Sequence, residues 1–406
     1  MKTIKLAFVG MGRRGPGQME NVLKNFQEVD VVAVCDVYPD RVENAQRIVK
    51  EIRGTDCKGY TDYKELLKND EIEAVVVTAS WEDHIKIAVD AMKAGKITAM
   101  EVGGAYSIDE CWQLVHTWEE TQTPFMFLEN CCYGRNELLA NSLVRHGNFG
   151  EIVNCHGAYV HDCRPQIADG VKIRHYRQRN YLNRNCDNYP THDLGPIAKI
   201  LNINRGNRMV SLVSVASKAR GMHTYVNSRE GYDTLHERIW AQGDIVETII
   251  SCADGATISL KLSTTLPHPY TREFSVYGTK GCYREDGDIV FEDCKNYEKG
   301  HWMYENIGSA KEYEAEYLPE CWKNITPEEI EAGHGGMDIF MWRAFFDAIQ
   351  NGKEMPIDVY DAASWMVISC LSEHSVRTGG HPVDIPDFTN GKWLLRSPKD
   401  VVNFNF

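Results

Sequence analysis

The sequence predicts an α/β protein with an N-terminal doubly wound parallel sheet and a C-terminal α+β domain, whose sheet is open and predominantly antiparallel. Three observations lead to this prediction. Short apolar runs alternate with helical patterns up to about residue 129, the first run leads into a glycine-rich turn, and several runs after residue 150 alternate like antiparallel strands. We therefore expect two domains, covering residues 1–129 and 130–406.

Composition narrows the class of protein. The chain has 406 residues, of which 43% are hydrophobic, enough for the cores of two or three domains. Its formal charge of −14 argues against nucleic-acid or anionic-membrane partners, because phosphate contacts need clustered lysine and arginine. No stretch approaches the ~20 apolar residues of a membrane span, and no early window has the pattern of a secretory leader. We expect a cytoplasmic protein that acts on a small molecule or a glycan.

Cysteine is abundant but scattered. The chain contains 13 cysteines, and none stand in a Cys-x-x-Cys pair. An odd number without a secretory leader indicates reduced thiols, so we expect neither a disulfide framework nor a metal site.

The first apolar run, Lys5–Val9, leads directly into a complete Gly-x-Gly-x-x-Gly formed by Gly10, Gly12 and Gly15. A helical pattern follows. Glycine at these positions allows a tight turn, close approach of the backbone to a pyrophosphate and close packing of helix on strand. The pyrophosphate then lies at a helix N-terminus, where free N–H groups favour an anion. These features predict a Rossmann domain that binds a dinucleotide.

The second apolar run, Val31–Cys35, ends in Asp36. A carboxylate at this position accepts hydrogen bonds from the adenosine ribose, which favours NAD over NADP. Arg13, Arg14 and Arg41 keep a phosphate-bearing cofactor as the alternative. We expect NAD.

Three more strands are predicted, at 74–77, 97–100 and 125–128, with helices at 85–94 and 108–120 between them. In such sheets ligands bind at the carboxyl ends of the strands. Polar or aromatic groups follow all three strands, in Thr78–His84, Glu101–Gly103 and Glu129–Asn130. The alternative for each group is a loop residue or a helix cap, which applies most directly to Ser80 and Asp83.

The second domain begins with a predicted helix at 134–146 and a strand at 151–159. Further strand-like segments cover 210–216, 240–242 leading through 245–251, 256–264 and 273–277, and Asp286-Gly287 predicts a turn. Helices are expected at about 337–350 and 362–378. A sheet that is open on one face makes a homo-oligomer the expected state.

A loop rich in arginine and tyrosine precedes the middle of the second domain, with Arg174, Tyr176, Arg177, Arg179, Tyr181 and Arg184. It is either a solvated basic surface or a hydrogen-bonding wall for a polyol. The stretch Asn188–Pro196 follows, in which Tyr189 and His192 precede a helix predicted to begin near Asp193. The pair either packs at a helix entrance as buried structural groups or faces a ligand.

The ordered motifs resemble one family over nearly the whole chain. A dinucleotide-binding half followed by an antiparallel sheet resembles the Gfo/Idh/MocA oxidoreductases, most of which carry Glu-Lys-Pro where this chain has Glu101-Val102-Gly103. The closer resemblance is to glycoside hydrolase family 109, the NAD-dependent α-N-acetylgalactosaminidases. It rests on Trp81-Glu82-x-His84, Met100-Glu101-Val102, Leu128-Glu129-Asn130, Tyr159-x-His161-Asp162, Tyr189-Pro190-Thr191-His192, Pro269-Tyr270 and Gly333-His334-Gly335-Gly336-Met337-Asp338.

The resemblance implies a glycoside hydrolase in which NAD stays bound and is recycled. The sugar C3 hydroxyl is oxidised, the aglycone is eliminated across C1–C2, water adds, and C3 is reduced again; two-carboxylate glycosidases work differently. Implied NAD contacts are Arg13, Arg14, Asp36, Trp81, Glu82, Asp83, His84, Glu101, Val102, Asn130 and Tyr189. Implied sugar contacts are Tyr159, Arg177, Tyr189, His192 and Tyr270, with His192, Tyr159 and Tyr189 as the catalytic group.

Two other functions remain in view. One is a net NAD-dependent sugar or polyol dehydrogenase on the same scaffold, which the absent lysine at Val102 disfavours. The other is a non-catalytic NAD-sensing or carbohydrate-binding protein, which the retained Tyr159, Tyr189 and His192 disfavour. Asp193 stands where the family commonly has glycine, and it could cap the helix, raise the pKa of the neighbouring histidine or bind a sugar hydroxyl.

Overall fold

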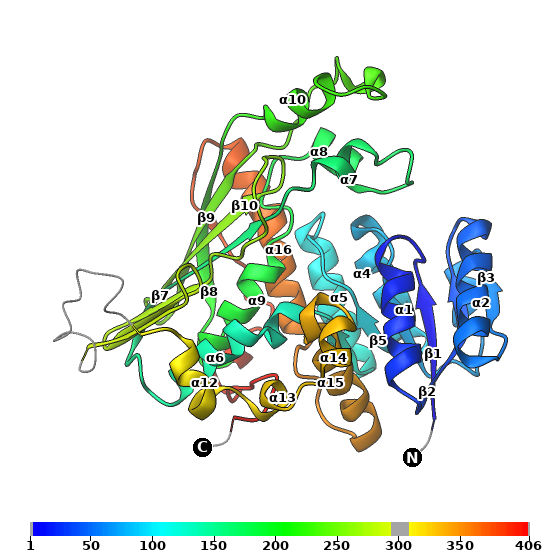
Figure 1. The fold of residues 1–406 in the computed structure, drawn as a ribbon, viewed down its shortest axis with the longest axis horizontal. Coiled ribbons are helices and arrows are strands. Elements are labelled where there is room, and N and C mark those ends of the chain that lie inside the picture. Colours follow the sequence, from blue (N-terminus) through cyan, green and yellow to red (C-terminus); the bar gives the residue numbers. More distant parts are fainter. Residues whose placement is uncertain (1–2, 294–307, 405–406) are drawn as a thin grey trace. The chain divides into compact units, whose positions relative to one another are not determined.

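The computed structural model describes residues 3–293 and 308–404. The chain forms two compact units (Figure 1). The first comprises Met1–Glu129, Val171–Tyr176 and Thr326–Ala363, and the second comprises Asn130–Gly170, Arg177–Ile325 and Ser364–Phe406. Two segments from far beyond residue 129 therefore fold with the N-terminal part of the chain.

The first unit is built on a six-stranded parallel sheet in the order β3-β2-β1-β4-β5-β6. Its strands are β1 (Ile4–Val9), β2 (Val29–Cys35), β3 (Lys58–Tyr60), β4 (Ala74–Val77), β5 (Ile97–Met100) and β6 (Phe125–Phe127). The central strand β4 is buried throughout, as expected of a sheet covered on both faces. The predicted doubly wound parallel sheet is confirmed.

Helices connect these strands, and two further helices come from the distant segment Thr326–Ala363. They are α1 (Arg14–Asn25), α2 (Pro39–Arg53), α3 (Tyr63–Leu67), α4 (Trp81–Lys93), α5 (Ile108–Thr121), α14 (Pro327–Glu331) and α15 (Met337–Asn351). The indole of Trp342 in α15 packs 6.3 Å from the ring of Phe8, and its N–H donates to Gln18 at 2.6 Å. Phe346 packs edge-on against Phe26 at 5.0 Å. Helix α15 thus completes the core of the first unit.

The second unit contains an eight-stranded sheet in the order β13-β12-β11-β7-β10-β9-β8-β14. Its strands are β7 (Ile152–Val160), β8 (Met209–Ala216), β9 (Val246–Cys252), β10 (Thr257–Ser263), β11 (Ser275–Gly278), β12 (Gly281–Arg284), β13 (Ile289–Glu292) and β14 (Val383–Asp384). The β7–β10 pair is parallel and the remaining pairs are antiparallel. The predominantly antiparallel sheet is confirmed.

One face of this sheet is covered and the other is open. In β9 every second residue is buried, whereas Glu247, Ile249 and Ser251 are exposed. The helices of the unit include α6 (Arg135–Arg145), α7 (Arg164–Ala168), α8 (Arg177–Asn183), α9 (Thr191–Ile200), α10 (Gly221–Asn227), α12 (Lys311–Tyr317), α13 (Glu320–Lys323) and most of α16 (Val359–Arg377). None of the helices in the described ranges is long and apolar enough to cross a membrane.

Several boundaries differ from the prediction. Helix α9 begins at Thr191, with Pro190 at the N-cap, two residues before Asp193, near which the sequence predicts its start. Helix α4 begins at Trp81, so the motif Trp81–His84 is its first turn and not a loop. The segment 240–242 is not a strand, and the tail contributes β14. The predicted Asp286-Gly287 turn joins β12 to β13, with Gly287 in a left-handed conformation.

Candidate functional site

The glycine turn of the first unit has the geometry of a dinucleotide cradle. A Cβ atom at Gly10 would lie 2.4 Å from the backbone nitrogen of Ala79, and one at Gly15 would lie 2.2 Å from the Gly10 carbonyl oxygen. A Cβ atom at Gly12 would meet nothing closer than Arg41 Nη1 at 3.5 Å. Two glycines therefore allow close packing of the turn, and the third leaves open space in front of the backbone.

Asp36 lies at the end of β2 and is joined to this turn. Its Oδ2 accepts the backbone N–H of Met11 at 2.8 Å, and its Oδ1 accepts that of Tyr38 at 3.0 Å. Arg41 Nη1 lies 3.6 Å from Oδ2. The carboxylate is thereby fixed beside the open space at Gly12, where an adenosine ribose requires an acceptor.

Arg14 is held by the protein's own carboxylates. Its Nε donates to Glu101 at 2.8 Å, and its Nη1 and Nη2 each donate to Asp338 at 3.0 Å. The arginine holds the pKa of Asp338 well below its usual range, and the two carboxylates raise the pKa of Arg14. Gln18 also donates to Glu101. This network fixes the entrance of α1 next to the glycine turn, and Arg13 beside it is exposed.

Further predicted cofactor residues lie at the carboxyl ends of β4 and β5. Trp81 and His84 are buried in the first turn of α4, and Val102 is buried after β5. His84 Nε2 lies 3.0 Å from the carbonyl oxygen of Ala79, and burial lowers the pKa of His84, which keeps the ring neutral. Glu82 is half-buried and Asp83 is exposed.

The helix-cap alternative for Ser80 and Asp83 applies only in part. Ser80 occupies the N-cap position of α4 but makes no side-chain bond to a helix N–H. Its hydroxyl instead donates to Asp83 at 2.6 Å. The space at Gly12, the fixed carboxylate of Asp36 and the helix N-terminus together fit NAD.

The second unit carries the predicted sugar contacts, and Tyr159 is at their centre. Tyr159 lies near the carboxyl end of β7, two residues after Gly157 and on the same face of the strand. A Cβ atom at Gly157 would lie 2.8 Å from that of Asp193, so α9 packs directly on β7 here. This close packing brings the N-terminus of α9, with Tyr189 and His192, over Tyr159.

The rings form a compact cluster. Tyr159 lies 4.7 Å from Tyr189 and 5.5 Å from His192, and Tyr189 lies 4.7 Å from His192. Tyr270 is 6.1 Å from Tyr159. The guanidinium of Arg177 lies 5.3 Å from the ring of Tyr189. All five predicted sugar-binding residues are therefore brought together within one unit.

The phenol of Tyr159 is held in its protonated form. Burial raises the pKa of Tyr159 well above its ordinary value, so the hydroxyl stays protonated at neutral pH. Its oxygen lies 3.1 Å from Nδ1 of His161, whose ring also packs 5.4 Å from that of Tyr270. Sequence reasoning quoted His161 within a motif but gave it no role. The spacing could have indicated this contact, because His161 follows Tyr159 by two residues and side chains two residues apart on a strand lie on the same face.

Other buried groups hold the cluster in place. Arg272 donates to the hydroxyl of Tyr270 at 3.0 Å and to Glu137 at 2.6 Å. Asn130 is buried in a short 3₁₀ helix at the start of the second unit. Asp193 is also buried and lies in the first turn of α9, where Pro190 is the N-cap, so the alternative in which Asp193 caps this helix is wrong.

The arginine- and tyrosine-rich loop is largely helical and divided between the two units. Arg174 and Tyr176 belong to the first unit, whereas α8 in the second contains Arg177 and Tyr181, both buried. Arg184 is also buried and pairs with Glu373. The interpretation as a solvated basic surface is wrong for Arg177, Tyr181 and Arg184, whereas Arg174 and Arg179 are exposed, as that interpretation expects.

Asp187 is a buried acid two residues before Tyr189. Its backbone N–H donates to Ser372 and its carbonyl oxygen accepts from Ser369, which ties this loop to α16. Burial raises the pKa of Asp187 to about 7, although the backbone N–H of Tyr189 favours the ionised form. Among the described residues its Oδ2 has no hydrogen-bond partner.

We expect Asp187→Asn to make the protein less sensitive to pH. Between about pH 4 and pH 7 the carboxyl of Asp187 is protonated in the folded protein but ionised in the unfolded chain. Rising pH therefore favours the unfolded chain over this window, and the stability of wild type declines. The stability of the variant relative to wild type should rise over this window and stay level above it. Urea unfolding at pH 5, 6, 7 and 8 measures this difference. A difference independent of pH would contradict the expectation.

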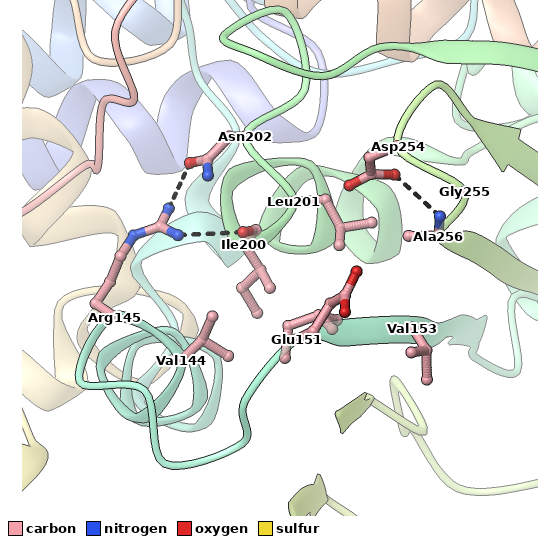
Figure 2. Close-up of a pocket in the computed structure, with 11 residues that line it drawn as sticks. Val144, Arg145, Glu151, Val153, Ile200, Leu201, Asn202, Asp254, Gly255 and Ala256 are labelled. Atoms are coloured by element: carbon pink, nitrogen blue, oxygen red, sulfur yellow. Dashed lines mark hydrogen bonds between the residues drawn. The ribbon is translucent and has the colours of Figure 1, made fainter. Parts of the chain in front are cut away.

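The structure also has a separate cavity of about 340 Å³ in the second unit (Figure 2). Arg145 at its edge donates to the carbonyl oxygen of Ile200 and to Asn202, and Asp254 accepts the backbone N–H of Ala256. Arg145, Asn202 and Asp254 are thus engaged in hydrogen bonds within the protein. None of the predicted site residues lines this cavity, and we assign it no role in the reaction.

Two family models match the chain. Residues 4–128 match the oxidoreductase family with an NAD-binding Rossmann fold, and residues 133–395 match the C-terminal domain of glycosyl hydrolase 109. The matches meet close to the boundary between the first unit's N-terminal part and the second unit.

Similar proteins cover the same length. The alpha-N-acetylgalactosaminidase of Tannerella forsythia is 36% identical over 97% of this chain and 88% of that protein. The alpha-N-acetylgalactosaminidase of Shewanella oneidensis is 34% identical over 99% and 88%, respectively. Among solved structures, levoglucosan dehydrogenase in complex with NADH and L-sorbose has a TM-score of 0.70 at 18% identity, covering 95% of this chain and all of that one. The myo-inositol 2-dehydrogenase of Lactobacillus plantarum has a TM-score of 0.67 at 18% identity, with coverage of 95% and 100%. At such identities the structural likeness shows the fold.

Proposed function

The chain belongs to glycosyl hydrolase family 109, and from that premise we propose that it hydrolyses α-linked N-acetylgalactosaminides or related glycosides with a tightly bound, recycled NAD. The observation that carries the proposal is the cluster of Tyr159, Tyr189 and His192. It offers a protonated phenol and an imidazole side by side. The chemistry needs a proton donor and a proton acceptor at one sugar ring.

The first unit supplies the cofactor site. Gly10, Gly12 and Gly15 would receive the pyrophosphate, and Asp36 would bind the adenosine ribose. We propose the further contacts named from the sequence, namely Arg13, Arg14, Trp81, Glu82, Asp83, His84, Glu101, Val102, Asn130 and Tyr189. When bound, NAD would supply a hydride acceptor for the oxidation of sugar C3 and, once reduced, the hydride that restores C3 at the end of the cycle. Arg14 would act by supporting the turn, because its guanidinium is already bonded to Glu101 and Asp338.

The second unit would carry the proton transfers. His192 would accept the proton of the C3 hydroxyl during oxidation and pass it to solvent. Once C3 is a ketone, the neutral imidazole would take up the acidified proton at C2. Loss of that proton breaks the C1–O bond, and the phenol of Tyr159 protonates the departing oxygen. His161 then restores the proton of Tyr159 through their 3.1 Å contact. Addition of water at C1 and reduction at C3 complete a hydrolysis with no net redox change.

The remaining residues would hold the sugar. Arg177, Tyr189 and Tyr270 present a guanidinium and two phenol rings, groups that bind sugar hydroxyls and the apolar faces of sugar rings. Arg272 keeps Tyr270 in position. Asp193 is packed against β7 at Gly157, which favours a role in seating α9 over direct contact with the sugar.

The open face of the second sheet supports assembly into a homo-oligomer. Val215 and Ile249 are more than half exposed there, on neighbouring strands. Burial of such side chains between copies of the chain would be favourable.

The test is incubation with nitrophenyl glycosides in heavy water. We expect release of nitrophenol, no net accumulation of NADH, and deuterium at C2 of the released sugar, because the C2 proton is removed and replaced in each cycle. Mass spectrometry of the sugar and absorbance at 340 nm provide the two readouts. Stoichiometric NADH without release of the aglycone would support a net sugar dehydrogenase, and no reaction with any glycoside or sugar would support a binding protein.

A further inference from the structure

Residues Val171–Tyr176 belong to the first unit, although the chain on either side of them belongs to the second unit. Helix α8 begins directly after this segment. One end of this segment is fixed to residues that follow β2. Arg174 donates to both oxygens of Asp40, at 2.9 and 2.6 Å, and its guanidinium lies 4.3 Å from the ring of Tyr38. Arg41 donates to the carbonyl oxygens of Ile173 and Arg174 at 2.9 and 3.2 Å. Side chain and backbone of the segment are therefore both held.

The other end of the segment is fixed to the residue that opens α4. The ring of Tyr176 packs 4.8 Å from that of Trp81, and His175 stacks on Tyr176 at 4.4 Å. Trp81 in turn occupies the space next to Gly103, where a Cβ atom would lie 2.5 Å from the indole ring. The glycine thus makes room for the indole that receives Tyr176.

The strand order shows what lies between these two attachments. Strand β1 is placed between β2 and β4 in the sheet. A segment attached after β2 and after β4, both at the carboxyl edge, must pass the carboxyl end of β1. Gly10 and Gly12 lie at that end. Two strand spacings amount to about 10 Å, a span that two residues and their side chains cover easily.

We propose that residues 171–176 form a strap across the dinucleotide site, which holds NAD in place and slows its release. Arg174 and Tyr176 are then positioning residues for the cofactor. The Arg174–Asp40 and Tyr176–Trp81 contacts must open before the dinucleotide can leave, as with other closing segments over active sites. The strap becomes an additional determinant of cofactor residence time.

This inference rests on the proposed function and deepens it. A net dehydrogenase must exchange its cofactor after each turnover, so a strap would slow it. A glycosidase that oxidises C3 and later reduces it again gains from a strap, since loss of the reduced cofactor in mid-cycle would leave a stranded keto sugar. We therefore expect slow release of NAD in a protein that hydrolyses glycosides without net oxidation of the sugar.

The test measures cofactor release without any sugar. Wild type, Arg174→Ala and a matched control, Arg47→Ala, are loaded with NAD, and the nucleotide that stays bound is followed by rapid gel filtration and chromatography. Arg47 is a suitable control because it is an exposed arginine of the same helix as Asp40, paired with Glu51 and away from the segment. We expect Arg174→Ala to release NAD about tenfold faster than wild type, and Arg47→Ala to match wild type.

Two further measurements separate a strap from a general structural role. The exchanged pair Asp40→Arg/Arg174→Asp should recover most of the slow release, whereas melting temperatures of all variants should stay close to wild type. Release from wild type should quicken at 0.5 M NaCl, because salt screens an exposed ion pair, and release from Arg174→Ala should change less.

Equal release rates for Arg174→Ala, Arg47→Ala and wild type would overturn the strap, as would release from wild type within the time of one filtration. These outcomes do not depend on hydrolysis. Slow release that depends on Arg174, in a protein that cleaves no glycoside, would leave the strap standing and remove the proposed function.

Discussion

His192→Ala is expected to lower the turnover of nitrophenyl glycosides by ~10² or more while the protein keeps its bound NAD. The imidazole is the proposed proton acceptor and lies 4.7 Å from Tyr189 and 5.5 Å from Tyr159, measured between ring centres. Since His192 is not among the residues that form the glycine cradle, its loss should leave the nucleotide content unchanged. Steady-state kinetics and nucleotide analysis of the same preparation provide both readouts.

The matched control is His156→Ala. His156 lies on β7, as Tyr159 does, but it pairs with Glu273 and is not part of the ring cluster. Its loss should change turnover little. Turnover of His192→Ala equal to that of the control would remove His192 from the mechanism.

Asp338→Ala is expected to destabilise the protein by about 3 kcal/mol, the lower end of the range for breaking a buried ion pair, because it leaves the half-buried guanidinium of Arg14 with half of its charge partners. Asp338 accepts from both terminal nitrogens of Arg14, and its side chain is only 3% exposed. Asp347→Ala in the same helix is the control, since Asp347 is half-exposed and pairs with Lys353 at the surface. Urea unfolding should find that control within about 0.5 kcal/mol of wild type.

The same ion pair predicts a pH dependence. Folding lowers the pKa of Asp338, so its contribution to stability is complete above the ordinary range of an aspartate and is lost as the pH falls toward the lowered value. The stability difference between wild type and Asp338→Asn should therefore be constant from pH 8 to pH 5 and shrink below about pH 4. A difference that grows toward acid pH would contradict this assignment.

Local patterns were sufficient to predict the first sheet. A run such as Ala74–Val77 is apolar at every position, and the helices between such runs leave few alternatives to a parallel order. The glycine turn was also predictable, because the residues that its close packing requires, Gly10, Gly12 and Gly15, lie within six positions of the sequence. The pairing of Tyr189 with His192 could likewise be expected, because the two residues are only three positions apart in the sequence.

Long-range contacts could not be predicted from patterns. Arg14 and Asp338 are far apart in the sequence, and nothing local to either residue identifies the other as its partner. Arg174 and Tyr176 lie in a loop whose composition fitted two interpretations, and neither placed them in the first unit. The predicted start of α9, near Asp193, lies two residues after the observed one, because the apolar run that indicates the helix begins only at Leu194, whereas the first turn already includes Thr191 and His192.

The contribution of α15 to the first unit has a consequence for synthesis on the ribosome. Phe8 and Phe26 are translated more than 300 residues before Trp342 and Phe346, the aromatic side chains that cover them. At typical elongation rates this delay is on the order of tens of seconds. Until α15 emerges from the exit tunnel, Phe8 and Phe26 lack this aromatic cover, and apolar surface left uncovered during synthesis is the kind that chaperones bind.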